Sequence, residues 1–131
     1  MELPVCDYSD YDYKKEFWEK TDRQYEEQCE HLALTKLFKK IPYTPECLMD
    51  AGCGFGRLFP LYEKWARNFI LFDYAANLLN EARKNIGKRA NIEFVQGNLY
   101  HIPVADARVD VVISVRVLHH IVQPELFFRE V

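Results

Sequence analysis

The sequence predicts an α/β fold, in which a parallel sheet carries helices on both faces. Apolar, strand-like runs alternate with helical stretches from about residue 46 to the end of the chain. One of these runs leads directly into three alternate glycines, Gly52, Gly54 and Gly56. Glycines at such a point let a chain leave a strand, turn tightly beneath a ligand and enter a helix. Right-handed crossovers are expected to join the parallel strands.

The length of 131 residues predicts a single domain, spanning residues 1–131. Within it, residues 1–45 are predicted to form an N-terminal leader and helices, and residues 46–131 the α/β core. The leader is acidic and rich in tyrosine, and Tyr11 and Tyr13 are candidates to close over a ligand and contribute a cation–π contact. From Tyr13 to Lys40, apolar residues recur at intervals of three and four, which predicts one long or two shorter amphipathic helices. Thr21 and Asp22 are candidate caps of the second helix.

Four strands and three helices are expected in the core. The predicted strands cover residues 47–49, 68–72, 92–95 and 109–115, and the predicted helices cover residues 58–66, 75–85 and 124–130. Gly87 is expected to close the second of these helices. Several aromatic side chains are expected in the core rather than around a ligand: Phe17, Trp18, Tyr25, Phe127 and Phe128.

Composition narrows the range of functions. Hydrophobic residues make up 49% of the chain and charged residues 28%, with a formal net charge of −3 and no basic run. We therefore do not expect nucleic acid as a partner. No apolar run approaches the roughly 20 residues of a membrane span, so no membrane association is expected. The four cysteines form no Cys-x-x-Cys pair. They predict neither a metal site nor a redox dithiol, but reduced thiols in a cytoplasmic protein.

Polar residues follow the predicted strands at the edge where parallel sheets bind ligands. Asp50 comes just before the glycine turn, Asp73 follows the second strand and Asn98 the third. Ser114 and Arg116 stand at the end of the fourth. Asp73 follows Asp50 by about 20 residues, the distance at which such folds place an acid to accept hydrogen bonds from a ribose.

The glycine turn does not suit a nicotinamide dinucleotide. That ligand favours Gly-x-Gly-x-x-Gly, and the position of the third glycine is occupied by Arg57. Asp50 is also poorly matched to a pyrophosphate. A ligand with a positive centre and an adenosine ribose fits better, which indicates S-adenosylmethionine. A turn without a ligand, with Asp50 as a helix cap, is the plainer alternative.

From Leu48 to Val131 the sequence resembles the class I S-adenosylmethionine-dependent methyltransferases of the small-molecule type. The motifs that carry this resemblance are Asp50-Ala51-Gly52-Cys53-Gly54-Phe55-Gly56, Asp73, Gly97-Asn98-Leu99, Ile102-Pro103, Val109-Asp110-Val111-Val112 and Leu118-His119-His120-Ile121. Trp18, Arg23 and Tyr25 add a weaker similarity ahead of the core. The resemblance implies a Rossmann-like core, of which only the N-terminal part of a seven-stranded sheet is present.

The resemblance also implies roles for individual residues. The three glycines would lie under the methionine and ribose, Asp73 would accept from the ribose hydroxyls, and Asn98 with Leu99 would contact the adenine. Asn98 departs from the aspartate that is common at its position, although its amide oxygen can still accept a hydrogen bond. The predicted cofactor-binding residues are Asp50, Gly52, Cys53, Gly54, Gly56, Asp73, Tyr74, Asn98, Leu99, Ser114 and Arg116.

The predicted function is therefore methyl transfer from S-adenosylmethionine to a small molecule, with S-adenosylhomocysteine as the product. No catalytic residue is assigned; His119, His120 and Tyr11 are candidate bases, and capping or surface roles are the plainer interpretation of the histidines. Two alternatives stay open. One is a cofactor-binding, methyltransferase-like subunit or a fragment without activity of its own, and the other is a nicotinamide-binding fragment.

The fourth strand carries a prediction about partners. In a sheet that ends at residues 111–115, this strand would have an unpaired edge, which proteins usually cover or pair. We therefore expect a homo-oligomer or a complementary subunit to bind through that edge.

Overall fold

The computed structural model describes residues 3–7, 9, 12–19 and 23–131. These residues form a parallel sheet of four strands in the order β3-β2-β1-β4. The strands are β1 (Cys47–Ala51), β2 (Asn68–Asp73), β3 (Ile92–Gln96) and β4 (Val111–Ile113). The helices are η1 (Lys14–Glu19), α1 (Gln24–Phe38), α2 (Phe59–Tyr62), α3 (Ala76–Ile86), η2 (Leu118–His120) and α4 (Pro124–Glu130).

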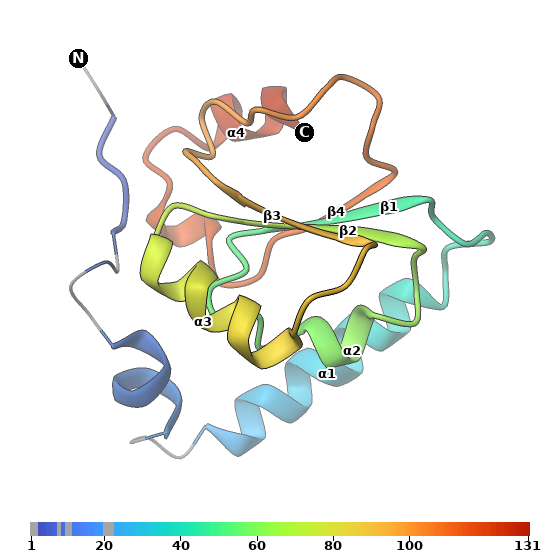
Figure 1. The fold of residues 1–131 in the computed structure, drawn as a ribbon, viewed down its shortest axis with the longest axis horizontal. Helices are drawn as coiled ribbons and strands as arrows, with labels where there is room; N and C mark the ends of the chain where they lie inside the picture. Colours follow the sequence, from blue (N-terminus) through green and yellow to red (C-terminus); the bar gives the residue numbers. More distant parts are fainter. Residues whose placement is uncertain (1–2, 8, 10–11, 20–22) are drawn as a thin grey trace.

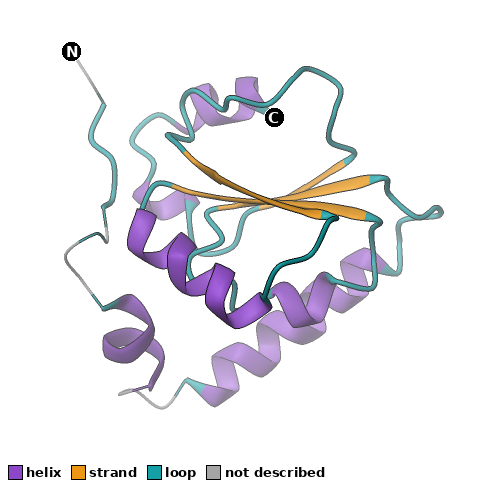
Figure 2. Cartoon of the chain, in the orientation of Figure 1, coloured by secondary structure: helices purple, strands orange, loops and turns teal. Residues whose placement is uncertain are grey.

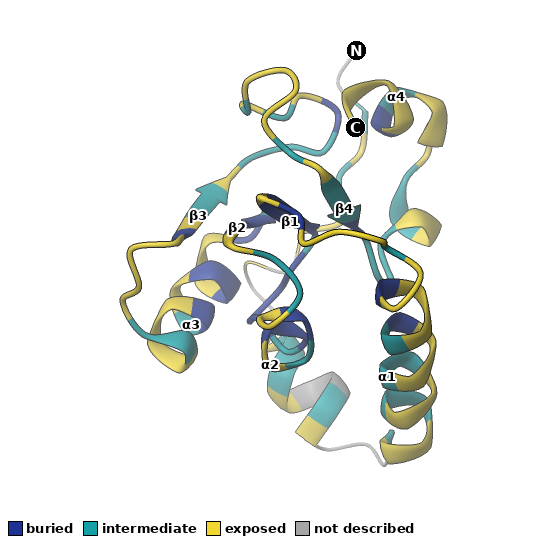
Figure 3. Cartoon of the chain, turned by 90° about the vertical axis from the view of Figure 1, so that its right-hand side faces the viewer, coloured by how far each residue is buried: buried dark blue, intermediate teal, exposed yellow. Residues whose placement is uncertain are grey.

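Helices cover both faces of the sheet, as the sequence predicted. In Figures 1 and 3, α1, α2 and α3 lie on one face and α4 lies on the other. Figure 2 shows that loops connect most strand ends to these helices. Among the described residues, no helix has both the length and the apolar character that crossing a bilayer requires.

Strand β1 is buried along its whole length, and its alternating side chains enter two cores. Leu48 belongs to the core beneath α1 and α2, which also contains Phe38 and Tyr62. Met49, one residue on, belongs to the core beneath α4 with Phe127. Because alternate side chains of a strand point to opposite faces, Asp50 shares the α1 and α2 side with Leu48. This places a carboxylate against α2.

Two core elements are shorter than predicted. Helix α2 ends at Tyr62 because the Trp65 N–H donates to the Tyr62 carbonyl, 2.9 Å away, in a tight turn. Strand β4 begins at Val111, after the Asp110 carboxylate has accepted hydrogen bonds from the backbone at Glu46 and Cys47. The predicted helices 75–85 and 124–130 correspond to α3 and α4, and Gly87 caps α3.

The N-terminal region contains two helices, one of the two predicted arrangements, but of the apolar residues whose spacing predicted α1, Phe38 faces the core and several others do not. Tyr25 is 80% exposed, Leu32 64% and Leu37 58%, whereas Leu34 and Phe38 are buried. Beside Leu34 and Phe38, the inward face of α1 carries carboxylates that pair with arginines of the core. Burial of Tyr25 was therefore a wrong expectation.

Of the other aromatic residues expected in the core, some are buried and some are exposed. Phe127 is buried as expected, but its neighbour Phe128 is 60% exposed, so that expectation is wrong. Trp18 packs against the buried cluster around Phe55. Thr21, Asp22, Tyr11 and the side chain of Phe17 lie outside the described residues.

Candidate cofactor site

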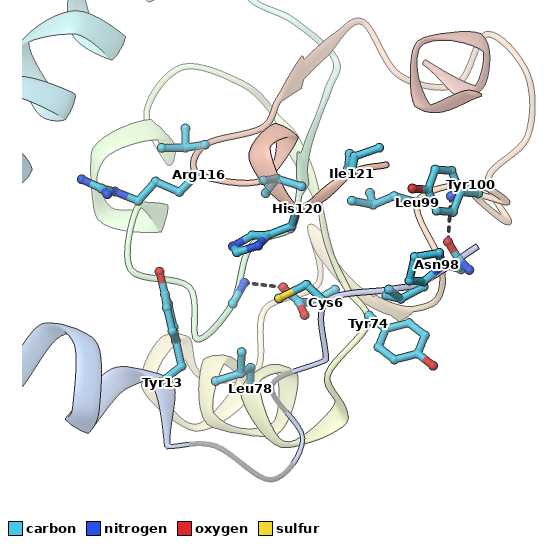
Figure 4. Close-up of a pocket in the computed structure, with 17 residues that line it drawn as sticks. Cys6, Tyr13, Tyr74, Leu78, Asn98, Leu99, Tyr100, Arg116, His120 and Ile121 are labelled. Atoms are coloured by element: carbon cyan, nitrogen blue, oxygen red, sulfur yellow. Dashed lines mark hydrogen bonds between the residues drawn. The ribbon is translucent and has the colours of Figure 1, made fainter. Parts of the chain in front are cut away.

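A cavity of about 110 Å³ lies at the carboxyl ends of the strands (Figure 4). We call it the main cavity. It is lined from the glycine turn, from the ends of β2, β3 and β4, and from the leader. Seven of the predicted cofactor-binding residues line it: Gly52, Gly54, Asp73, Tyr74, Asn98, Leu99 and Arg116. The topology has thus brought segments far apart in sequence to one site.

The glycine turn needs its glycines for different reasons. All three have positive φ, from 56° at Gly54 to 90° at Gly52. A Cβ at Gly52 would lie 2.4 Å from a methyl carbon of Val117, so close packing requires glycine there. A Cβ at Gly54 would meet nothing within 4 Å. Since Gly54 lines the main cavity, the open space beside it is room for a ligand.

Gly56 faces away from the main cavity. A Cβ there would approach Ile86 of α3 to 3.0 Å and Ala82 to 3.3 Å. Its place in the structure is therefore the contact between the turn and α3. Ser114 also lies outside the lining, and its hydroxyl donates to the Ala51 carbonyl at 2.9 Å, which joins the ends of β4 and β1.

Asp73 holds the turn in place. One carboxylate oxygen accepts the Gly54 N–H at 2.7 Å and the other accepts the Ala75 N–H at 2.9 Å. Burial raises the pKa of the Asp73 carboxyl, although these backbone hydrogen bonds act in the opposite direction. Each carboxylate oxygen has a further lone pair, so Asp73 can still accept from a ligand hydroxyl in the main cavity.

Asp50 and Cys53 line a second, smaller cavity of about 40 Å³, which we call the small cavity. Gly52, Gly54 and Arg116 line both cavities, so the two are adjacent across the glycine turn. Burial raises the pKa of the Asp50 carboxyl to about 7, and the hydrogen bond from Tyr62 acts against this rise. Burial also raises the pKa of the Cys53 thiol, which leaves it in the unreactive form.

Two arginines tie the site to the N-terminal helices. Arg57 donates to Glu30 of α1 at 2.7 Å, and its guanidinium stacks 3.7 Å from the ring centre of Trp18. Arg116 pairs with Glu26 at 2.8 Å and also with Glu30. Arg116 has a φ of 60°, uncommon for a residue with a side chain. Its guanidinium pairs with carboxylates of α1, and the residue lines the main cavity.

Asn98 forms a local turn at the end of β3. Its side-chain oxygen accepts the Tyr100 N–H at 2.9 Å, shown as a dashed line in Figure 4. The Tyr100 hydroxyl in turn accepts the Val122 N–H at 3.0 Å. The Asn98 side-chain oxygen, which was expected to accept a hydrogen bond from the adenine, therefore already accepts one hydrogen bond within the chain.

The lining also includes residues that sequence reasoning did not assign to cofactor binding. These are Pro4, Val5, Cys6, Tyr13, Leu78, Tyr100, Val115, Val117, His120 and Ile121. The ring of His120 points into the cavity toward Cys6 in Figure 4. Burial, and secondarily the neighbouring His119, lower the pKa of His120. Apolar residues in a loop carry no sequence signal for a ligand, but Tyr13 and His120 had been noted for other reasons.

A family model described as a methyltransferase domain matches residues 49–131. The match begins within β1, includes the glycine turn and extends through all the strands that line the main cavity. The chain belongs to the methyltransferase domain family. The cofactor of this methyltransferase domain is S-adenosylmethionine. The predicted family, fold and cofactor are thereby confirmed.

Sequence relatives agree with this assignment. A protein of Encephalitozoon cuniculi named as a methyltransferase is 36% identical over 92 residues, which are 70% of this chain and 40% of the relative. A protein of Mycobacterium tuberculosis named as an S-adenosylmethionine-dependent methyltransferase is 33% identical over 90 residues, 66% of this chain and 32% of the relative. The chain thus spans less than half the length of these relatives.

Solved structures share the fold. An S-adenosylmethionine-dependent methyltransferase of Methanococcus maripaludis has a TM-score of 0.78 at 19% identity, covering 99% of this chain and 60% of that one. A methyltransferase of Haloferax volcanii, solved with the activator Trm112, has a TM-score of 0.67 at 21% identity and covers 89% and 52%. At these identities the similarity concerns the architecture.

Proposed function

We propose that the chain, or the protein to which it belongs, transfers the methyl group of S-adenosylmethionine to a small-molecule acceptor. One observation carries the proposal most directly. Gly54 lines the main cavity and has open space at its Cβ position, and the Asp73 carboxylate is fixed beside it by a 2.7 Å hydrogen bond. A backbone without a side chain next to an anchored carboxylate suits a ribose and the group attached to it.

Each end of the cofactor has matching residues in this proposal. Gly52 and Gly54 lie beneath the methionine and ribose, and Asp73 accepts from the ribose hydroxyls. Asn98, Leu99 and Tyr74 contact the adenine; they line the same cavity and lie together on the side away from Arg116 in Figure 4. Asp50 and Cys53 border the methionine end from the small cavity. Gly56, Ser114 and Arg116 act indirectly, by fixing the turn, the strand ends and α1.

The bound cofactor supplies an electrophilic methyl group on a sulfonium. The residues of the chain then have to hold an acceptor in line with it, and positioning alone is worth on the order of 7–11 kcal/mol in well-oriented reactions. His120 is the candidate base that faces the main cavity. Its lowered pKa favours the neutral imidazole, which can accept the proton of the acceptor.

Calorimetric titration tests cofactor binding. We expect S-adenosylhomocysteine to bind and NAD not to bind, because Arg57 occupies the position where a dinucleotide site needs glycine. Asp73→Ala should weaken the binding by at least about tenfold, since it removes a charged acceptor. Binding of NAD without binding of S-adenosylhomocysteine would overturn the proposal. Unchanged affinity of Asp73→Ala for S-adenosylhomocysteine would show that Asp73 does not bind the ribose.

Methyl-labelled cofactor, incubated with the chain and a small-molecule fraction of a cell extract, tests the transfer. Label in an extracted metabolite supports an enzyme with a small-molecule acceptor. Cofactor binding without transfer favours the alternative of a cofactor-binding subunit. A Xylella fastidiosa relative, 31% identical over 91 residues, is named malonyl-[acyl-carrier protein] O-methyltransferase. An acid bound to a carrier protein is absent from a small-molecule fraction and is therefore tested as a separate acceptor.

We further propose that the free edge of β4 binds a second copy of the chain or a complementary subunit. In the described residues, β4 pairs with β1 alone, which leaves the N–H and C=O groups of its other edge without a strand partner. The Haloferax volcanii relative was solved with a separate activator chain. Light scattering at micromolar concentration should detect association of this chain, and a monodisperse monomer would count against self-association.

A further inference from the structure

A buried tyrosine holds the acidic residue beneath the glycine turn. The Tyr62 hydroxyl on α2 donates to the Asp50 carboxylate at 2.9 Å. Tyr62 is 0% exposed and Asp50 is 2% exposed. This hydrogen bond connects helix α2, which lines neither cavity, to Asp50, which lines the small cavity.

The tyrosine ring is fixed independently of this hydrogen bond. It packs edge-on to Phe59 with ring centres 5.4 Å apart, and it lies 5.8 Å from Phe69 of β2. Aromatic contacts of this kind hold a ring in one orientation. The hydroxyl therefore reaches Asp50 from a rigid support, and substitution by phenylalanine would remove the hydrogen bond while keeping the packing.

The charges around Asp50 leave its carboxylate poorly compensated. Asp73 of β2 opposes its ionisation, Arg57 favours it, and Tyr62 donates to it. The Cys53 thiol lies beside it, and Arg116 lines the same small cavity but is paired with Glu26 and Glu30. A buried carboxylate in such surroundings ionises readily only when a further positive group arrives.

We propose that Tyr62 is a positioning residue that fixes the Asp50 carboxylate as the counter-ion of the positively charged methionine end of S-adenosylmethionine. The inference rests on the proposed cofactor site and adds a residue outside that site. The positive group needed by Asp50 is then the cofactor itself, bound on the other side of Gly52 and Gly54.

Proton release on binding is the distinguishing consequence. The pKa of Asp50 is raised to about 7 in the protein, so near neutral pH part of the population carries a proton there. A cation bound beside Asp50 favours the ionised form, and binding must displace that proton. Affinity for the cofactor should thus increase as the pH rises through about 7. Loss of the Tyr62 hydrogen bond, which favours ionisation, should shift this increase to higher pH.

The experiment measures the dissociation constant of S-adenosylmethionine by calorimetry at several pH values below and above about 7, for the wild type, Tyr62→Phe and Asp50→Asn. We expect Tyr62→Phe to bind about tenfold more weakly at neutral pH and to regain affinity at higher pH. Asp50→Asn should bind weakly at every pH. Tyr43→Phe, at a tyrosine that is 59% exposed, is the matched control and should follow the wild type.

The double variant Asp50→Asn/Tyr62→Phe, compared with Asp50→Asn, separates positioning from packing, because a packing defect of Tyr62→Phe would weaken binding in both backgrounds. Once the carboxylate is absent, loss of the hydroxyl should change the affinity less than twofold. An equal loss in both backgrounds, or wild-type binding without pH dependence, would overturn the inference and leave the cofactor site intact. No binding at any pH would overturn both the inference and the proposed function.

Discussion

At Gly54, the addition of a single methyl group should affect cofactor binding more than folding. A Cβ there meets no described atom within 4 Å, and Gly54 lines both the main and the small cavity. We expect Gly54→Ala to fold, at a cost of roughly 1–2 kcal/mol for an alanine at positive φ. Overlap with the ligand should weaken cofactor binding by roughly tenfold or more. Chemical denaturation and calorimetric titration measure the two effects.

Gly87→Ala is the matched control. Gly87 also has positive φ, 81°, and open space at the Cβ position, but it caps α3 and lines none of the cavities described above. The Gly87→Ala variant should be less stable than the wild type and keep its affinity for the cofactor. Equal affinity in Gly54→Ala and Gly87→Ala would show that the space beside Gly54 is not used by the ligand.

The buried aspartates predict how stability depends on pH. Burial raises the pKa of Asp50 from 3.8 to about 7 and also raises that of Asp73. The folded protein thus holds more protons than the unfolded chain between these values, and its free energy of unfolding should fall as the pH rises through them. Asp50→Asn should flatten this decline and stabilise the cofactor-free protein at neutral pH, on the order of 1–3 kcal/mol.

Denaturant unfolding at several pH values checks this, with Asp106→Asn on the surface as control. A steeper decline in Asp50→Asn than in the wild type would contradict the assignment of the buried charge. A gain in stability that accompanies a loss of cofactor binding is the pattern expected of a residue kept for function.

Some site residues were predictable because they obey local rules. Glycines before a helix and an acid about 20 residues later follow from backbone geometry and the ribose contact. The role of Asp73 in holding Gly54 could not be predicted in this way, because that hydrogen bond joins two different strand ends. The same applies to Tyr62, a residue that looks like ordinary helix core in sequence.

At the scale of elements, α1 is attached to the core both by apolar packing, through Leu34 and Phe38, and by charge. Glu30 pairs with both Arg57 and Arg116, and the Arg57 and Glu30 side chains are only 13% and 15% exposed. Glu30→Gln would leave these partly buried arginines short of a counter-charge. We expect it to destabilise the protein by roughly 1–3 kcal/mol, measured by chemical denaturation.

Glu63→Gln is the contrasting variant. Glu63 pairs with Arg89 at 2.9 Å, but these side chains are 39% and 48% exposed. Exposed pairs contribute little, so this variant should change stability by less than about 1 kcal/mol. If both variants had the same small effect, the pairing of α1 with the core would be no stronger than a surface contact.

The orientation of α1 shows the limit of periodicity. The spacing of its apolar residues predicted a helix, and the helix is present. The inward face carries, besides Leu34 and Phe38, carboxylates that pair with arginines 27 to 90 residues away in sequence, whose partially buried guanidinium groups require a counter-charge. Local spacing contains no information about those partners.

For the whole molecule, cofactor binding should appear as added stability. A ligand that binds only the folded state at a concentration of 100 times its dissociation constant adds about 2.7 kcal/mol. We expect S-adenosylhomocysteine to raise the midpoint of thermal unfolding accordingly, and NAD to leave it unchanged. Asp73→Ala should lose most of the shift; a full shift in that variant would mean that the ligand binds elsewhere.

The sequence by itself determined the alternation of strands and helices, the glycine turn and the order of polar residues at the strand ends. These follow from periodicity and from the backbone freedom of glycine, which are local properties. The tertiary structure alone decided that Asp73 anchors Gly54, that Tyr62 holds Asp50, and that α1 presents carboxylates to Arg57 and Arg116. Each of these contacts joins residues of different elements, which come together only when the strands align in the sheet or the helices pack on it, so no local pattern specifies them.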